Sequence, residues 1–341
     1  MKKKTILVTG GLGFIGSNLV LHLIKLNYFV IVLDKKTYSS NLMNLKNIKK
    51  NQFKLIISDI NNKFQVSKIL KKYNPIGIFN LAAETHVDRS IDNPEIFVKS
   101  NVNGVLVLLE QLRDYKKQNL NIKFLHISTD EVYGDIPRGK NSLETDAYNP
   151  SSPYAASKAS ADHLIRSYYR TFKLPIIITN CCNNYGPKQF PEKLIPKLIL
   201  NLIQNKKLPL YGKGINEREW IHVDDHCKAL ITIFKKGKIG QSYNIGSGDI
   251  VSNNTISKKL IKLFKTKINK NCKSKIIYVK DRPGHDLRYA LNSRKIKKLG
   301  WKKKLNLDNG LFLTIKWYLK NTHWLKKINK NKYSSRLGIK I

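Results

Sequence analysis

Short apolar runs alternate with longer stretches of helical periodicity over the first half of the chain. The apolar runs predict strands at residues 5–8, 29–33, 54–57, 77–81, 123–128 and 175–179. Helical periodicity occupies residues 13–26, 66–72 and 95–115 between them. Strands that are apolar throughout and separated by helices predict a parallel sheet covered on both faces. We therefore expect an α/β fold, a Rossmann-like doubly wound sheet.

The alternation weakens after Tyr185, where Gly186-Pro187 and Phe190-Pro191 interrupt the chain. We interpret the chain beyond this point as a smaller C-terminal portion that binds a substrate. The predicted boundaries are residues 1–185, with a return segment near 221–247, for the larger domain. The smaller domain takes residues 186–220 and 248–325, and residues 326–341 form a basic tail.

Three glycines, Gly10, Gly13 and Gly16, connect the first predicted strand to the first predicted helix. Glycines there permit a tight turn and let a pyrophosphate approach the helix N-terminus. Asp34 ends the next strand, where an acidic side chain can accept bonds from the adenosine ribose. The spacing predicts an NAD-binding domain. Lys35 and the lysine after it leave NADP open, because they could meet its 2′-phosphate.

Tyr154 and Lys158 are four residues apart on a predicted helix that begins at Ser151-Ser152-Pro153. Serine at the cap and proline at the first position favour that start. Residues at i and i+4 share one helix face, so phenol and ammonium can act on one site. A lysine cation stabilises phenolate, which makes Tyr154 a candidate base in hydride transfer.

Asp130 and Glu131 directly follow the strand predicted at 123–128. In open α/β sheets, ligands collect at the carboxyl ends of the strands. Adjacent carboxyls in one cleft tend to hold different pKa values, so one can act as acid and the other as base. A redox step alone does not need this pair, which indicates proton transfer at carbon and oxygen as well.

The 341-residue chain carries 63 Lys and Arg against 23 Asp and Glu, a formal charge of +40. The lysines are dispersed among Asn and Ile, and no nucleic-acid-binding motif is present, so we expect no specific nucleic-acid partner. No apolar run approaches the length of a membrane helix, and we expect a cytoplasmic protein. The four cysteines are expected to be reduced thiols, and no metal site is predicted.

Six segments resemble the extended short-chain dehydrogenase/reductase family, and within it the nucleotide-sugar 4,6-dehydratases that act on dTDP-glucose. They are residues 81–90, 128–135, 154–159, 180–187, 190–196 and 281–286. Epimerases and decarboxylases of the family look like Thr-Ser-Glu or Ser-Ser where this chain has Thr129-Asp130-Glu131. The resemblance covers nearly the whole chain.

The resemblance implies a cycle of internal oxidation and reduction at one sugar, on the way to rhamnose-type deoxysugars. Tyr154 would take the C4 hydroxyl proton while NAD takes the C4 hydride. Glu131 would remove the C5 proton, Asp130 would protonate the departing C6 hydroxyl, and the hydride would return to C6. Lys158 would hold the nicotinamide ribose and Thr129 the sugar at C4.

The same resemblance implies two sets of binding residues. The NAD site would be lined by Gly10, Gly13, Phe14, Ile15, Gly16, Asp34, Lys35, Asp59, Ile60, Leu81, Ala83, Thr85, Ser100, Tyr154, Lys158 and Asn184. The nucleotide sugar would face Thr85, Thr129, Asn183, Lys193, Leu194, Pro209, Tyr211, Arg218, Asn253, Arg282, His285 and Tyr289. Among these, Arg218, Arg282 and Lys193 are the expected diphosphate contacts.

Three alternatives stay open at this point. The base could be uridine, because a single methyl group separates it from thymidine and is worth only about 1–3 kcal/mol. The enzyme could be a UDP-sugar 4-epimerase or decarboxylase, although neither expels a C6 hydroxyl. The fold could also serve a non-catalytic binding protein. The apolar helices near 98–112 and 155–169 predict a homodimer, since the family pairs these helices across a four-helix interface.

Overall fold

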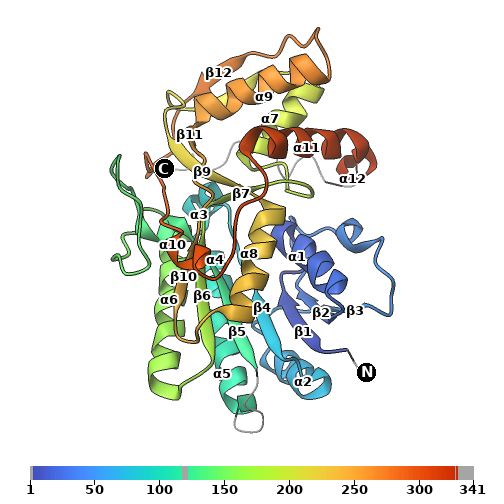
Figure 1. Ribbon diagram of the computed structural model, residues 1–341, viewed down its shortest axis with the longest axis vertical. Coiled ribbons are helices and arrows are strands. Elements are labelled where there is room, and N and C mark those ends of the chain that lie inside the picture. Colours follow the sequence, from blue (N-terminus) through green and yellow to red (C-terminus); the bar gives the residue numbers. More distant parts are fainter. Residues whose placement is uncertain (1–2, 117–121, 327, 329–341) are drawn as a thin grey trace.

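Seven parallel strands form the main sheet of the protein (Figure 1). The computed structural model describes residues 3–116, 122–326 and 328. In order across the sheet, the strands are β10 (Ser242–Ile245), β6 (Ile176–Cys181), β5 (Lys123–Thr129), β4 (Gly77–Asn80), β1 (Thr5–Thr9), β2 (Phe29–Asp34) and β3 (Phe53–Ile57). The predicted parallel sheet is confirmed, with strand ends that differ by one or two residues.

Alternating side chains of these strands pack into two cores, one on each face of the sheet. Ile6 and Val8 of β1 lie in the first core, with helices α1 (Phe14–Lys25) and α8 (Val223–Lys236). Leu7 lies in the second core, with α2 (Lys63–Tyr73), α5 (Gly104–Lys116) and α6 (Pro153–Phe172). A sheet buried on both faces explains why its strands read as continuous apolar runs.

Two smaller sheets and a third core lie beyond the carboxyl ends of the main strands (Figure 1). One sheet contains β11 (Ile250–Ser252), β9 (Glu217–His222) and β7 (Asn183–Tyr185), and the other contains β12 (Ile276–Val279) and β8 (Leu208–Tyr211). The helices of this half are α7 (Leu194–Ile203), α9 (Asn253–Lys267), α11 (Leu307–Lys320) and α12 (Thr322–Lys326). Helix α10 (Arg294–Lys297) instead packs beside β10 of the main sheet, and its Ile296 joins the first core.

The helix expected over 95–115 is interrupted. The chain forms α4 (Glu95–Phe97), a π-helical segment η2 (Val98–Asn103) and then α5. Within η2, Asn101 donates to Glu84 O at 3.0 Å and to Ser157 Oγ at 2.9 Å, bonds that tie it to neighbouring segments. Three short helices complete the order: η1 (Leu42–Leu45), α3 (Val87–Asp92) and η3 (Asp130–Tyr133).

Almost all of the predicted basic tail, 326–341, lies outside the described residues, and Lys326 closes α12. Over residues 3–116 and 122–326, none of the helices combines the length and the apolar composition needed to cross a membrane.

Candidate active site

One cavity of about 940 Å³ opens at the carboxyl ends of the main strands and runs between the main sheet and the two smaller sheets. It is lined by residues that end or follow β1, β2, β4, β5 and β6. Every site residue predicted from the sequence lines this single cavity, those expected for the cofactor and those expected for the substrate alike. Their individual roles remain predictions.

The glycine loop after β1 leaves room for a ligand's phosphates. Gly10 has a φ of +67°, and a Cβ there would lie 2.8 Å from Leu81 O. A Cβ on Gly16 would lie 2.2 Å from Gly10 O, so the helix could not approach the loop this closely with any other residue. Gly13 caps α1 without a side-chain bond, which leaves its N-terminal amides available to an anion.

Asp34 ends β2 beside this loop. Its Oδ2 accepts from Leu12 N at 2.9 Å, and its Oδ1 accepts from Lys36 N and Ser40 Oγ, both at 2.8 Å. The neighbouring Lys35 donates to Ser100 Oγ at 2.6 Å and lies 3.4 Å from a Glu84 carboxylate oxygen. The Asp34 carboxylate at this position would accept bonds from the ribose hydroxyls and repel a 2′-phosphate, which favours NAD over NADP.

The residues after β5 bring two carboxyls to the cavity wall. Thr129 Oγ1 accepts from Glu131 N at 3.3 Å, which caps η3, and lies 3.2 Å from Asp130 Oδ1. Asp130 is 3% exposed, and its Oδ2 has no hydrogen-bond partner among the described residues. Burial, with help from Glu131 and Glu219, raises the pKa of Asp130 well above its ordinary value. Asp130 is therefore suited to carry a proton at neutral pH.

Glu131 has a different environment from its neighbour. Burial raises the pKa of Glu131, but the cations Arg282, Lys193 and Arg218 oppose that rise. Both pKa values are raised, and that of Asp130 lies well above its ordinary value, so Asp130 is the better proton donor of the pair and Glu131 the better acceptor. Such a division of roles is what paired acid and base catalysis needs.

The predicted start of the Tyr154 helix is confirmed. Ser152 caps α6 by accepting from Ala155 N at 3.1 Å, and Pro153 is its first residue. Burial holds the pKa of Tyr154 well above its ordinary value, with Glu131 adding to the rise. Lys158 Nζ donates to Ile127 O at 2.7 Å and contacts His126 Nε2 at 3.2 Å. The ammonium is thus hydrogen-bonded to β5, and its expected effect on the Tyr154 phenol, which would act through its charge, stays a prediction.

Cationic side chains gather opposite the glycine loop. Lys193 Nζ donates to Thr85 O at 2.6 Å, and Arg282 Nη1 donates to Asp88 Oδ1 at 3.1 Å. Arg218 donates to Asp286 O at 2.9 Å, and its guanidinium lies 4.2 Å from the centre of the Tyr289 ring. Arg218 therefore supports the backbone as well as facing the cavity.

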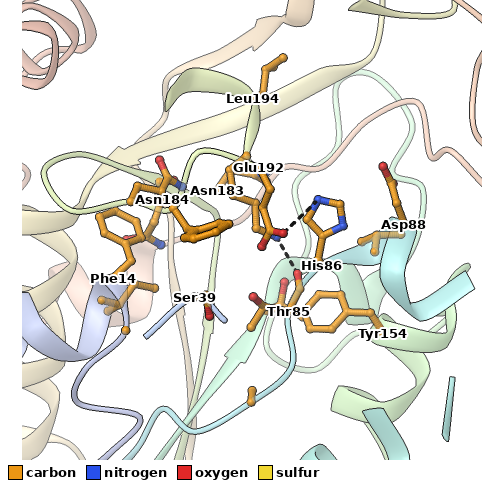
Figure 2. Close-up of a pocket in the computed structure, with 18 of the residues that line it drawn as sticks. Phe14, Ser39, Thr85, His86, Asp88, Tyr154, Asn183, Asn184, Glu192 and Leu194 are labelled. Atoms are coloured by element: carbon orange, nitrogen blue, oxygen red, sulfur yellow. Dashed lines mark hydrogen bonds and ion pairs between the residues drawn. The ribbon is translucent and has the colours of Figure 1, made fainter. Parts of the chain in front are cut away.

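Several cavity residues had no individual signal in the sequence analysis. Asp88 accepts from Tyr211 at 2.7 Å in addition to Arg282. Glu192 accepts from Tyr38 at 2.9 Å and from Arg89 at 3.2 Å, and Figure 2 shows it facing His86 across the cavity wall. Only their place within the segments 81–90 and 190–196 could have indicated them. Within the described residues, no group of His, Cys, Asp and Glu could hold a metal ion.

The sequence matches a known protein family over most of its length. The family profile described as GDP-mannose 4,6 dehydratase matches residues 7–313. The chain belongs to that family. It is 45% identical to dTDP-glucose 4,6-dehydratase of Salmonella typhimurium LT2 and 44% identical to dTDP-glucose 4,6-dehydratase 1 of Escherichia coli K12, each over 97% of both chains.

Solved structures of relatives share the fold over nearly the whole chain. The dTDP-glucose 4,6-dehydratase of Bacillus anthracis in complex with NAD is 41% identical, with a TM-score of 0.85 over 96% of this chain and all of that one. The Streptomyces venezuelae enzyme of the same name, also with NAD bound, is 40% identical. Its TM-score is 0.88, and the match covers 95% of this chain and 100% of that one. A UDP-glucose 4-epimerase of Thermotoga maritima is 29% identical and has a TM-score of 0.85, and the match covers 93% of this chain and 99% of that one. The fold is thus common to both classes, and only the site distinguishes them.

Proposed function

We propose that this protein is a dTDP-glucose 4,6-dehydratase, which converts dTDP-glucose to dTDP-4-keto-6-deoxyglucose. The observation that carries the proposal is Asp130, a buried carboxyl with a raised pKa and an oxygen without a partner among the described residues. A proton held there has one evident use, protonation of a leaving hydroxyl. The relatives of the same name, 44–45% identical over nearly full length, support the substrate class.

NAD fits the cavity as the cofactor. The glycine loop and the uncapped N-terminus of α1 would hold its pyrophosphate, and Asp34 lies where the adenosine ribose would sit. When bound, NAD supplies a hydride acceptor and donor. NAD is present in the related structures from Bacillus anthracis and Streptomyces venezuelae, which supports the choice.

The protein's own side chains would move the protons. Tyr154 would take the proton of the C4 hydroxyl as a phenolate, a form that burial disfavours and that the charge of Lys158, one turn later on α6, would stabilise. Glu131, where nearby cations oppose the rise in pKa that burial causes, would take the C5 proton and later return it to C5. Asp130 would give its proton to the C6 hydroxyl, which leaves as water. Over one cycle Tyr154 gains a proton and Asp130 loses one, and exchange of one proton with solvent at each residue restores both, so the net reaction releases none.

Arg282 and Lys193, with Arg218, would bind the diphosphate of the substrate. All three line the cavity and act electrostatically on Glu131, which indicates how near they lie to the reacting groups. The buried Asp130, suited to donate a proton, argues against the epimerase and decarboxylase alternatives, because neither reaction expels a C6 hydroxyl. UDP-glucose remains the alternative substrate.

We also propose a homodimer formed through two of the helices that cover one face of the sheet. Helices α5 and α6 lie side by side there (Figure 1). Together with α4 and η2 they expose large apolar side chains, namely Ile96, Val98, Leu106 and Phe172. An exposed apolar face of this kind is typical of a subunit interface. The four cysteines are buried free thiols, which supports a reducing, cytoplasmic location.

The decisive test is to incubate purified protein with dTDP-glucose and with UDP-glucose in separate reactions. We expect a 4-keto-6-deoxy product from dTDP-glucose without added cofactor, and release of NAD when the protein is denatured. A C4 epimer as the product would refute the dehydratase assignment. Faster turnover of UDP-glucose would refute the choice of base, and NADP alone in the released ligand would refute the role given to Asp34.

A further inference from the structure

A buried carboxylate lies behind the active-site lysine, outside the cavity. Asp162 follows Lys158 by one turn of α6 and is 0% exposed. It does not line the cavity, whereas Lys158 does. Removing a charge from solvent in this way is costly unless a partner compensates it, so the surroundings of Asp162 must contain that partner.

The two oxygens of Asp162 are used unequally. Oδ2 accepts from Ser128 Oγ at 2.7 Å, from Tyr148 OH at 3.0 Å and from Asn180 Nδ2 at 3.4 Å. These donors come from β5, from the loop before α6 and from β6, so the carboxylate is held from three sides. Oδ1 has no hydrogen-bond partner among the described residues.

His126 lies between the unbonded oxygen, Asp162 Oδ1, and the Lys158 ammonium of the active site. His126 Nε2 lies 3.6 Å from Asp162 Oδ1 and 3.2 Å from Lys158 Nζ. The other ring nitrogen of His126 contacts Asn80 Nδ2 at 3.0 Å, and Asn80 accepts from Thr9 Oγ1 at 2.6 Å, which fixes the ring. Burial, with Lys158 nearby, holds the pKa of His126 well below its ordinary value, so this ring is neutral. The countercharge for Asp162 on this side is therefore Lys158.

We propose that Asp162 is a positioning residue for the reaction, which keeps the Lys158 ammonium charged and in place through the neutral spacer His126. Asp162 touches neither substrate nor cofactor and acts only through Lys158. The inference rests on the proposed function, in which Lys158 stabilises the phenolate of Tyr154.

The direction of the effect follows from the charges around the lysine. Burial lowers the pKa of Lys158 to about 8, and Asp162 opposes this lowering. The other titratable and charged groups that face the pair are His126 of β5, Cys181 of β6, Tyr148 of the loop, Tyr154 and Arg166 of α6, and Asp130 and Glu131 of η3. Without the carboxylate, burial is less opposed, and Lys158 loses its proton at a lower pH.

The first test is the pH profile of kcat/KM for Asp162→Asn. Because the charged lysine is required, the profile falls on the alkaline side as Lys158 deprotonates. We expect Asp162→Asn to move that alkaline limb down by at least about one pH unit, the order expected for loss of a nearby opposite charge. Asp225→Asn is the matched control, since Asp225 is equally buried but accepts from Lys304 N and Leu305 N, outside the cavity. The alkaline limb of the Asp225→Asn profile should stay at the wild-type pH.

The second test monitors Lys158 without catalysis, from the thermal stability of the purified protein. Between a folded pKa of about 8 and the ordinary 10.5, the unfolded chain binds more protons at Lys158, so this residue makes stability rise with pH. The difference in Tm between wild type and Lys158→Met should show that rise. In the Asp162→Asn background the rise should begin below pH 8. An unchanged onset would overturn the proposal.

Two further outcomes are decisive. If Asp162→Asn fails to fold, Asp162→Ser removes the same charge with a smaller polar side chain, and the limb must then move in the same direction. A shift in the opposite direction, or equal shifts in Asp162→Asn and Asp225→Asn, would refute the role. A wild-type protein that turns over no nucleotide sugar would instead refute the proposed function, and the stability test would still decide for or against Asp162.

Discussion

Replacing Asp130 by asparagine tests the chemistry at its most specific point. The change keeps the size of the side chain and its contact with Thr129 but removes the acidic proton. We expect oxidation at C4 to proceed in Asp130→Asn while loss of the C6 hydroxyl becomes slow. The reduced form of the nicotinamide should therefore accumulate in a single turnover.

The size of the effect depends on whether another carboxyl of the cavity is free to act as the acid. Burial raises the pKa of Asp88, but His86 and Arg282 outweigh it and hold that pKa below its ordinary value. Burial raises the pKa of Glu192 as well, but Glu192 is tied to Arg89 and Tyr38. With neither free to replace Asp130, the variant should lose the full contribution of a general acid, about 10²–10⁴-fold. That loss corresponds to about 3–5 kcal/mol in the barrier for elimination.

The measurement is stopped-flow absorbance of the reduced nicotinamide, combined with quenched-flow analysis of the sugar. Asp135→Asn is the control, because Asp135 lies on the same loop, accepts from Arg288 N at 2.8 Å and does not line the cavity. It should eliminate at the wild-type rate. Elimination at the wild-type rate in Asp130→Asn would show that another group protonates the leaving hydroxyl.

The site and the surface give three further predictions. Tyr154→Phe should give no reduced nicotinamide in a single turnover while substrate affinity, measured by calorimetry, stays close to wild type; near-normal oxidation would assign the base elsewhere. Arg282→Gln should raise KM at least about tenfold through loss of a charge-assisted bond, whereas Arg138→Gln, whose side chain is 79% exposed, should leave KM unchanged. Light scattering should give twice the monomer mass, and Leu106→Glu with Ile96→Glu should give monomers; a wild-type monomer at micromolar concentration would contradict the interface.

The sheet could be predicted because its strands are buried on both faces. Ile6, Leu7 and Val8 are all apolar, although they alternate between two cores, so the run is visible without knowledge of the partners. The π-helical η2 could not be predicted, since its cause is a set of contacts made by Asn101 with distant residues. The division into two domains stays a prediction.

The site residues at the strand ends could be placed from chain order alone, because parallel strands bring their carboxyl ends to one edge. The second partners of these residues could not. Arg218 was expected to contact phosphate, and nothing in the sequence shows that it also binds the carbonyl of Asp286. Asp162 and Asp88 lack a signal for the same reason, since their partners lie on other elements.

Asp88 supplies the negative charge that pairs with the Arg282 cation of the cavity. Its two oxygens hold Arg282 and Tyr211, so neither side chain is without a partner when no anion is bound. Arg282 Nε is buried and has no partner among the described residues, so the guanidinium keeps a donor available. A phosphate that reaches Arg282 therefore meets a side chain that Asp88 already holds in place, so binding requires little further ordering of that cation. The net charge of +40 has little to do with this step. Capture of the anion at this point depends on local pairing, and its affinity should vary less with ionic strength than the charge of the whole chain suggests.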